Sequence, residues 1–406
     1  MAETTTIQSN ALMLHGAKDM RFETQQVPPP LPHEVQVSIK ATGLCGSDLH
    51  YYNHGRNGNF VLQSPLILGH ESSGIVTAVP STAINGSTST TDPSTPTVPI
   101  GTRVALEVGL PCRTCHLCTT GRYNLCPSLK FRSSAKTFPH THGTLTQTLN
   151  HPASMCHILP PSVTYAQGAL VEPLAVSLHA INRSMRSLPS QSLSGTSALV
   201  LGAGAVGILT AAALSVQGVT SITIADIDKS RLEIASSLSP TIKLHTHLIP
   251  KTPRPTSSTS IEEKLSTATS LASSLQSSSP DPFIQTHGYT RVFECTGIES
   301  CVQTAIYAAS PGGAVLLVGM GVPVQTLPLG AAALREVDII GVFRYANAYP
   351  AAIALFASGK LDGVAEKVCT HRFALGEGKE AFEVAGKGVD KEGNVAVKCL
   401  IVGEEE

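Results

Sequence analysis

The chain has 406 residues, more than a single hydrophobic core usually supports, so two domains are expected. Its formal net charge is −1 and it has no basic stripe interleaved with aromatic side chains, which argues against nucleic acid as a partner. It begins without a basic segment followed by an apolar run and contains no run of about 18 apolar residues, so we expect a cytoplasmic protein with no membrane partner.

The first forty residues favour β-structure. Prolines at Pro28–Pro30 and Pro32 interrupt the pattern, and Val35, Val37 and Ile39 then alternate with other residues. Alternation of this kind is typical of strands that bury one face. A β-rich first domain is therefore expected.

Two short segments after these strands carry side chains that bind metals. Cys45 lies in Gly43–His50, and His70 and Glu71 lie in Leu68–Gly74. A thiolate, an imidazole and a carboxylate can bind one zinc ion and leave a position open, as a catalytic site requires. Taken singly, Cys45 would more often be an inert buried cysteine, and His70 a hydrogen-bonded core residue. Their combination favours an enzyme.

Four further cysteines crowd into fifteen residues at the spacing Cys-x2-Cys-x2-Cys-x7-Cys, namely Cys112, Cys115, Cys118 and Cys126. Four thiolates can close a tetrahedral zinc site that has no open position and only stabilises the surrounding lobe. An iron–sulfur cluster uses similar spacing, so both metal centres remain open on spacing alone. Ten cysteines are few for a disulfide framework in a chain of this length, which favours a reducing compartment.

Two stretches, 80–99 and 236–285, are rich in Ser, Thr and Pro. This composition buries too little apolar surface to order itself, so we expect a flexible surface loop at the first stretch. Within the second stretch, Ser260 and Glu263 have the spacing of a capping box, and apolar residues follow at helical intervals. One amphipathic helix with loose flanks is predicted there.

The segment from Ser197 to Asp226 has the pattern of strand, glycine turn, helix and strand. Gly202 permits the tight turn, Gly204 lets the backbone approach a pyrophosphate, and Gly207 lets helix and strand pack closely. Asp226 ends the second strand 24 residues after Gly202, as an acid that binds ribose should. The expected cofactor-binding residues are Gly202, Gly204, Ala205, Val206, Gly207, Asp226 and Arg231.

Together these motifs resemble the zinc-dependent medium-chain dehydrogenases, and within them the sorbitol, xylitol and L-arabinitol dehydrogenases. The resemblance covers Leu12 to about Leu400. It implies an α/β chain in which a GroES-like β-rich catalytic domain joins a Rossmann domain with a doubly wound parallel sheet. The expected bounds are 1–165 for the catalytic domain, with the cysteine lobe near 109–128, 166–342 for the Rossmann domain, and 343–406 for the part that returns to the catalytic domain.

The resemblance implies a proton path beside the first metal site. The hydroxyl of Ser47 touches the substrate oxygen, and His50 passes the proton toward solvent, while Asp48 orients His70. An ordinary alternative for Ser47 is a helix N-cap.

The metal and substrate assignments also follow from the resemblance. It implies a catalytic zinc faced by Cys45, His70, Glu71 and Glu172, and a structural zinc held by Cys112, Cys115, Cys118 and Cys126. Glu172 either binds the catalytic metal or holds its water, and its alternative is an acid in the first turn of a helix ahead of Pro173. Substrate contacts are expected from Tyr51, Glu172, Arg344 and Tyr345. An ordinary half-buried tyrosine and a surface salt bridge are the alternatives for Tyr51 and Arg344.

These assignments predict an NAD-dependent dehydrogenase with two zinc ions that oxidises a secondary alcohol of sorbitol, xylitol or L-arabinitol to the ketose. Asp226 favours NAD, because a carboxylate repels the 2′-phosphate of NADP. A zinc alcohol or threonine dehydrogenase is one alternative, and a catalytically silent regulator that binds zinc and nucleotide is another. The family resemblance implies a homotetramer.

Overall fold

The computed structural model describes residues 6–80, 98–186, 188, 192–239, 241–251 and 258–403. These residues form two compact units. The first unit runs to Glu172 and takes in Tyr349–Ser358 and the chain from Cys369 onward, whereas the second comprises Pro173–Ala348 and Gly359–Val368. This division reflects which residues lie close together and does not show which parts fold independently. The domain bounds expected from the sequence therefore stay a prediction.

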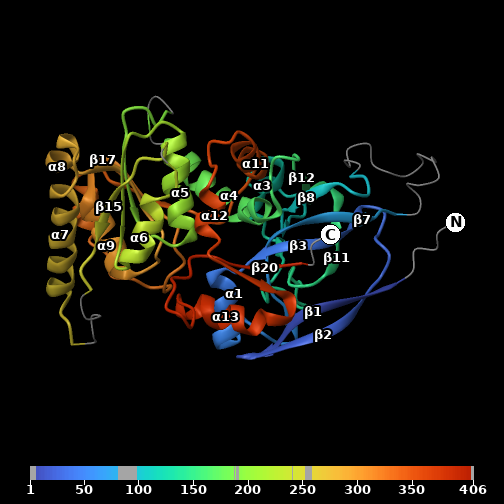
Figure 1. Ribbon diagram of the computed structural model, residues 1–406. Helices are drawn as coiled ribbons and strands as arrows, with labels where there is room; N and C mark the ends of the chain where they lie inside the picture. The colour runs from blue at the N-terminus through green and yellow to red at the C-terminus, as the bar shows by residue number, and fades with distance from the viewer. Residues whose placement is uncertain are drawn as a thin grey trace. The chain divides into compact units, whose positions relative to one another are not determined.

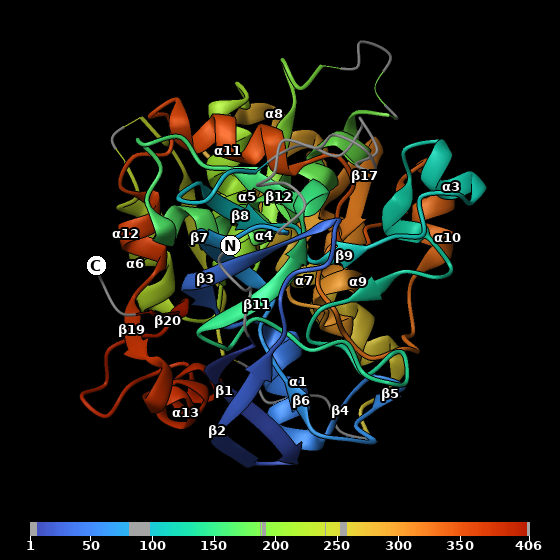
Figure 2. The ribbon, with the colours of Figure 1, turned by 90° about the vertical axis from the view of Figure 1, so that its right-hand side faces the viewer.

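The first unit is rich in β-structure, as expected (Figures 1 and 2). Its strands are β1 (Ile7–Gly16), β2 (Asp19–Val27), β3 (Glu34–Gly43), β4 (Arg56–Asn57), β5 (Phe60–Val61), β6 (Leu66–Ile67), β7 (Glu71–Ala78), β8 (Arg103–Leu106), β9 (Gly109–Leu110), β10 (Lys130–Phe131), β11 (Thr148–Pro152), β12 (Cys156–Ile158), β19 (His371–Ala374) and β20 (Cys399–Val402). Its helices are α1 (Gly46–His54), α3 (His116–Thr119), α11 (Tyr349–Ala357) and α13 (Gly378–Lys387).

The larger sheet of this unit has the strand order β12-β8-β7-β3-β20-β19, and β11 also pairs with β3. Val35, Val37 and Ile39 of β3 are each at most 6% exposed and pack with Val104 and Leu106 of β8, so the alternating run covers a core. Strand β20 pairs antiparallel with β3, so residues near the end of the chain belong to the sheet of the first unit.

The second unit contains an entirely parallel six-stranded sheet in the order β15-β14-β13-β16-β17-β18. Its strands are β13 (Ser197–Leu201), β14 (Ser221–Asp226), β15 (His245–Leu248), β16 (Tyr289–Glu294), β17 (Ala309–Leu317) and β18 (Asp338–Gly341). Residues 198–201 of the central strand are at most 1% exposed, which explains their uninterrupted apolar character. The strand order reverses at β13, and ligands of open parallel sheets bind at the carboxyl ends beside such a point.

Helices cover both faces of the parallel sheet. Figure 1 shows α5 and α6 on one side of the strands and α7 and α8 on the other. The helices of this unit are α5 (Ala205–Val216), α6 (Lys229–Ser236), α7 (Ile261–Ser277), α8 (Pro282–His287), α9 (Glu299–Ala308), α10 (Leu329–Ala333) and α12 (Val364–Val368), and α4 (Tyr165–Met185) begins in the first unit and ends in the second. None of the helices described is long and apolar enough to cross a bilayer.

The two Ser/Thr/Pro-rich stretches differ in what is described of them. The surface loop expected at 80–99 lies outside the described residues from 81 to 97. In the second stretch, helix α7 confirms the predicted amphipathic helix. The side chain of Ser260 accepts from the amide of Glu263, and the amide of Ser260 donates to the Glu263 carboxylate, which is the predicted capping box.

Candidate active site

Three of the predicted metal ligands lie together in the first unit. Cys45 is the N-cap of α1, His70 directly precedes β7, and Glu71 is the first residue of β7. One possible ligand atom from each lies within 4.8 Å of the other two. His70 and Glu71 are buried, but Cys45 is partly exposed, so the cluster is accessible from the side of Cys45. A sulfur, a nitrogen and an oxygen donor in this arrangement fit zinc with one position left open.

Asp48 supports His70 as the sequence predicts. Oδ1 of Asp48 lies 3.3 Å from Nδ1 of His70, and the carboxylate is completely buried. It also accepts from the amide of Gly69 at 3.1 Å and from the hydroxyl of Ser133 at 2.6 Å. Burial raises the pKa of Asp48, but the imidazole and these donors outweigh it, so the pKa falls below its usual value. Asp48 is thus an anion that fixes the orientation of the His70 ring.

The same cluster contains a cation that the sequence analysis missed. The ammonium of Lys398 donates to the Glu71 carboxylate at 2.8 Å and 2.7 Å, and the side chain of Lys398 is 5% exposed. Burial lowers the pKa of Lys398, but the charges of Glu71 and Cys45 outweigh it and raise the pKa above its ordinary value. The feature of the sequence that could have revealed Lys398 is its position as one lysine within the apolar run Val395–Val402.

The two residues of the expected proton path lie on α1. Oγ of Ser47 is 3.4 Å from Nε2 of His70, and His50 is exposed to solvent one turn further along the helix. The alternative in which Ser47 caps the helix is wrong, because the N-cap is Cys45 and Ser47 is already helical. Asp48 occupies the first turn as expected.

Glu172 is buried in the interior of α4, which begins seven residues earlier at Tyr165. Its alternative as an acid in the first turn of a helix is therefore wrong. The charge of Glu172 contributes to the raised pKa of Lys398, which places it in the electrostatic surroundings of the cluster. Within the described chain, however, the group of mutually close ligand atoms comprises Cys45, His70 and Glu71 and does not include Glu172.

Tyr51 is 1% exposed, and its phenol oxygen accepts from the amide of Ala135 at 2.9 Å. The ring belongs to a buried core cluster that also contains Leu68 and Leu145. This geometry resembles the ordinary alternative more than an open substrate contact, and the substrate role of Tyr51 stays a prediction.

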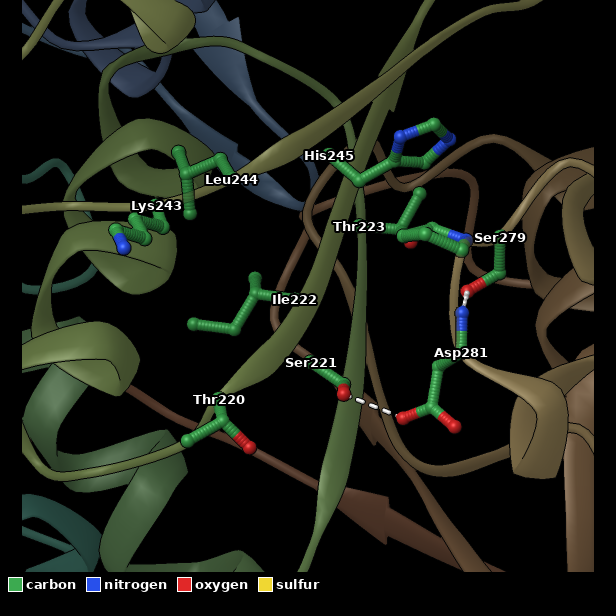
Figure 3. A pocket seen from close by; sticks show the side chains of 10 residues that line it. Thr220, Ser221, Ile222, Thr223, Lys243, Leu244, His245, Ser279 and Asp281 are labelled. Carbon is green, nitrogen blue, oxygen red and sulfur yellow. Dashed lines mark hydrogen bonds between the residues drawn. The ribbon is translucent and has the colours of Figure 1, made fainter.

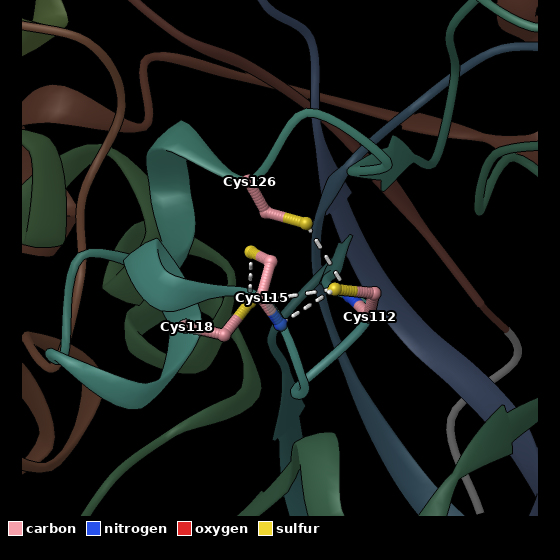
Figure 4. Close-up of side chains that lie close together, drawn as sticks. All are labelled: Cys112, Cys115, Cys118 and Cys126. Carbon is pink, nitrogen blue, oxygen red and sulfur yellow. Dashed lines mark hydrogen bonds between the residues drawn. The ribbon is translucent and has the colours of Figure 1, made fainter.

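The second predicted metal site is a compact group of four thiols. Sulfur atoms of Cys112, Cys115, Cys118 and Cys126 all lie within 4.8 Å of one another (Figure 4). Two of these residues precede α3, Cys118 lies in it, and Cys126 follows the short 3-10 helix Tyr123–Leu125. Backbone amides of Thr114 and Cys115 lower the pKa of Cys112 to about 6, whereas burial and the neighbouring thiols raise the pKa of Cys118 to about 12. A cation among these sulfurs would stabilise all four as thiolates, so the donor set fits a closed zinc site.

The glycine turn of the second unit has the geometry that a dinucleotide site requires. Gly202 adopts φ of +100°, a conformation that side chains disfavour. A Cβ on Gly207 would lie 1.8 Å from the carbonyl oxygen of Gly202, so only glycine permits this close packing. Gly204 directly precedes α5, whose first residues are Ala205 and Val206. The helix N-terminus therefore begins at the turn, as a phosphate-binding loop needs.

Asp226 stands at the carboxyl end of β14 beside this turn. Its Oδ2 accepts from the amide of Ala203 at 2.6 Å, and its Oδ1 accepts from the amide of Asp228 at 2.9 Å. Asp228 itself caps α6 by accepting from the amides of Ser230 and Arg231. Nη1 of Arg231 would lie 3.8 Å from a Cβ on Gly204, so this guanidinium also borders the turn.

Two cavities of the second unit lie at opposite ends of its strands. One of about 370 Å³ is lined by Glu294, Gly297, Leu317 and Gly319, at the carboxyl ends of β16 and β17. Another of about 280 Å³ is lined by Ser221 and His245, the first residues of β14 and β15, and by Asp281, which accepts from the Ser221 hydroxyl (Figure 3). Because cofactors bind open parallel sheets at the carboxyl ends, the first cavity fits the expected nicotinamide cofactor and the second does not.

Arg344 and Tyr345 belong to the second unit. Arg344 is partly buried at φ of +51°, and its guanidinium carbon lies 4.8 Å from the ring centre of Phe343. Tyr345 is 3% exposed. The left-handed backbone at Arg344 is uncommon for a residue with a side chain and is often kept at functional positions. Their contact with a substrate stays a prediction.

Comparisons with known proteins agree with this architecture. Residues 31–161 match the alcohol dehydrogenase GroES-like domain, and residues 205–358 match the zinc-binding dehydrogenase family. Sorbitol dehydrogenase from Rattus norvegicus is 37% identical over 399 residues, covering 98% of each chain, and that from Gallus gallus is 36% identical over 399 residues, covering 97% of each. The crystal structure of L-idonate 5-dehydrogenase from Escherichia coli has a TM-score of 0.78 at 24% identity over 98% of this chain and 99% of that one, a likeness of fold alone. These likenesses confirm the α/β class with GroES-like and Rossmann parts.

Proposed function

Since the chain belongs to the zinc-binding medium-chain dehydrogenases with a GroES-like domain, we propose that it oxidises a secondary alcohol of a sugar alcohol to the ketose with NAD. The substrate that we propose is sorbitol, xylitol or L-arabinitol. Curated relatives called sorbitol dehydrogenase, similar over nearly the whole chain, support this substrate class.

The observation that carries the proposal is the convergence of Cys45, His70 and Glu71. A nicotinamide-binding protein without catalysis needs no such cluster of metal ligands accessible on one side. Asp48 holds the His70 ring at 3.3 Å, an arrangement that prepares the imidazole for a metal. The cluster therefore favours an enzyme over a silent regulator.

Zinc held by these residues would polarise the alcohol oxygen, and a bound nicotinamide would accept the hydride. In our proposal Oγ of Ser47, which lies 3.4 Å from Nε2 of His70, accepts the proton of the substrate hydroxyl and gives up its own hydroxyl proton toward His50. His50, exposed on the same helix, releases that proton to solvent. The alcohol thus loses a proton to solvent and a hydride to the cofactor, which leaves a ketone.

We assign recognition of the polyol to Arg344 and Tyr345, with Glu172 and Tyr51 as further contacts. A guanidinium presents several donors in a fixed plane, which suits a row of hydroxyl oxygens. Stacking of Arg344 beside Phe343 limits the freedom of that plane. Replacing Arg344 by Ala should raise KM for polyols and leave the Kd of NAD unchanged. A fall in cofactor affinity with an unchanged polyol KM would remove Arg344 from the substrate site.

We propose NAD over NADP because two acids stand where a 2′-phosphate would bind. Asp226 ends β14, where its Oδ2 accepts from the amide of Ala203 in the glycine turn and its Oδ1 accepts from the amide of Asp228. A phosphate there would meet the carboxylate as a like charge in a partly desolvated site. Arg231 borders the turn, but Asp228 receives the backbone amide of Arg231 and adds a second negative charge beside it.

We further propose two zinc ions in each chain, one at the cluster around Cys45 and one at the four thiols. Among partners we propose the polyol itself and other copies of this chain, as a tetramer. Nucleic acid and membrane are not proposed as partners, and a cytoplasmic location is proposed from the composition.

Activity across a panel of substrates tests the function. We expect kcat/KM with NAD to be at least about a hundredfold higher for sorbitol, xylitol or L-arabinitol than for ethanol or threonine, because a site that hydrogen-bonds hydroxyls discriminates strongly against alcohols that lack them. Higher values for ethanol or threonine would support the corresponding alternative dehydrogenase. An absence of turnover with zinc and cofactor both bound would support the silent regulator.

A further inference from the structure

Lys398 is an unusual residue for its position. It directly precedes β20, and its neighbours along the same face, Ala396 and Leu400, are 4% and 0% exposed. A lysine among such residues is costly unless its ammonium is fully matched. Its three donors are matched by the two oxygens of Glu71, at 2.8 Å and 2.7 Å, and by the carbonyl oxygen of Leu44 at 2.9 Å.

The Glu71 carboxylate is held on two sides. Lys398 donates to both of its oxygens, and a Cβ on Gly43 would lie only 2.3 Å from Oε2. Glycine at position 43 therefore provides the space in which the carboxylate lies. Each carboxylate oxygen can accept more than one bond, so the pair with lysine leaves Glu71 able to face a metal as well.

A conflict of charge follows from this geometry. Glu71 contributes to the cluster with Cys45 and His70, but it is also the partner of a buried ammonium. A divalent cation bound by the three ligands would contact the Glu71 carboxylate, and so does the ammonium of Lys398. The two positive charges would repel each other. In a poorly solvated site such repulsion between nearby charges is strong.

We propose that Lys398 is a positioning residue that competes with zinc for Glu71 and makes this carboxylate an exchangeable ligand. The lysine lowers the affinity of the cluster for zinc and keeps one coordination position available to the substrate. This role rests on the proposed zinc site at Cys45, His70 and Glu71. It deepens that proposal by assigning the weakest of the three bonds to Glu71.

Release of zinc to an excess of chelator tests this role. Zinc should leave the unaltered protein in two kinetic phases, one for each proposed site. The phase that is absent from Cys45→Ser is the release of zinc from the cluster. Lys398→Met removes the charge and keeps the length of the side chain, so zinc should leave the cluster about tenfold more slowly, within the range that neighbours of metal ligands exert. Lys398→Arg keeps the charge and should release zinc like the original protein.

A matched pair shows whether Lys398 acts through Glu71. In a chain that carries Glu71→Gln, adding Lys398→Met should change the rate of zinc release less than about threefold. The carboxylate for which zinc and Lys398 compete is absent from that chain. If the methionine variant does not fold, Lys398→Gln, which still donates to Glu71, should show the same slower release.

Two results would overturn the role of Lys398. Release from Lys398→Met or Lys398→Gln that is as fast as in the original protein, or faster, would mean that the lysine supports the site and does not compete. If Lys398→Met slows zinc release equally in the Glu71→Gln chain, Lys398 acts directly on the metal and not through Glu71. If the original protein holds no zinc at the cluster, the proposed function fails as well, whereas zinc and polyol turnover with unaltered release would remove only the inference.

Discussion

Cys45 and Ser47 are two residues apart in the sequence, but we propose separate roles for them. We expect Cys45→Ser to lose the zinc of the cluster and all polyol oxidation, because only two ligands remain in an open site. Ser47→Ala should keep that zinc and lower kcat by about 10²–10⁴-fold, the range of general acid–base catalysis. Metal content and steady-state kinetics of the two variants check this. Full zinc occupancy in Cys45→Ser would contradict the assignment of this ligand.

In our proposal the choice of cofactor depends mainly on Asp226. Asp226→Ser combined with Ile227→Arg should move the ratio of kcat/KM for NAD and NADP toward NADP, since one negative charge is removed and one positive charge added. Asp228→Asn removes the second acid while an Asn side chain still caps α6, so it should move the ratio in the same direction but less. Comparable kcat/KM for both cofactors in the unaltered protein would refute the role of Asp226.

Short motifs in the sequence predict some residues of the candidate site, but other residues of the site lie in no such motif. Cys45, His70 and Glu71 could be found because their donors lie in two brief motifs. Lys398 could not be found in this way, since it is 327 residues from Glu71 and meets it only when β20 pairs with β3. Burial of Tyr51 depends on the packing of its core cluster, which spacing does not contain.

At the scale of elements, the cysteine lobe is joined to the sheet by more than its thiols. The hydroxyl of Tyr123, between two of the cysteines, donates to Glu107 at 2.5 Å, and His157 of β12 meets the other oxygen of Glu107 at 2.7 Å. Because closed zinc sites contribute folding free energy, Cys115→Ser should lose one zinc and lower the midpoint of thermal unfolding.

The exposed His116 lies in the same lobe but is not among the grouped thiols, so His116→Ala is the control for that experiment. It should keep both zinc ions and the original midpoint. Equal metal loss from the two variants would argue that the lobe responds to any substitution and that the thiols are not specific ligands.

Helix α7 provides a second prediction for an element. Ser260→Ala removes the side chain that accepts from Glu263, which should cost about 1 kcal/mol of local helix stability. Hydrogen exchange of residues 261–277 should become faster, whereas Ser270→Ala in the exposed middle of the helix should leave it unchanged or slower. No difference between the two variants would mean that packing alone holds the helix.

Elements with strong local signals were predictable, and their edges were less so. The capping box and helical periodicity predicted α7, and the glycine turn predicted β13, α5 and β14. Two alternatives that concern helix starts were wrong. Cys45, and not Ser47, is the N-cap of α1, although serine is the usual N-cap residue. Pro173 lies inside α4 and does not mark its first turn.

At the scale of the whole molecule, long-range order followed from the family resemblance and not from periodicity. Alternation in β3 predicts a strand with a buried face, but it does not say that β20, more than 350 residues later, completes the same sheet. The parallel sheet was easier to predict, because strands and helices alternate along residues 197–341. Discontinuous units such as the first one need information beyond local pattern.

The fate of one hydrogen tests the central claim most directly. Xylitol, sorbitol and L-arabinitol with deuterium at all of their secondary carbons would be incubated with the protein and NAD, and both products examined by NMR. We predict a ketose that has lost deuterium at the carbonyl carbon alone, NADH that carries one deuterium, and no reaction after zinc is removed from the cluster. An aldose that retains the deuterium, or turnover that survives the loss of this zinc, would contradict a zinc-dependent polyol dehydrogenase that acts on a secondary alcohol.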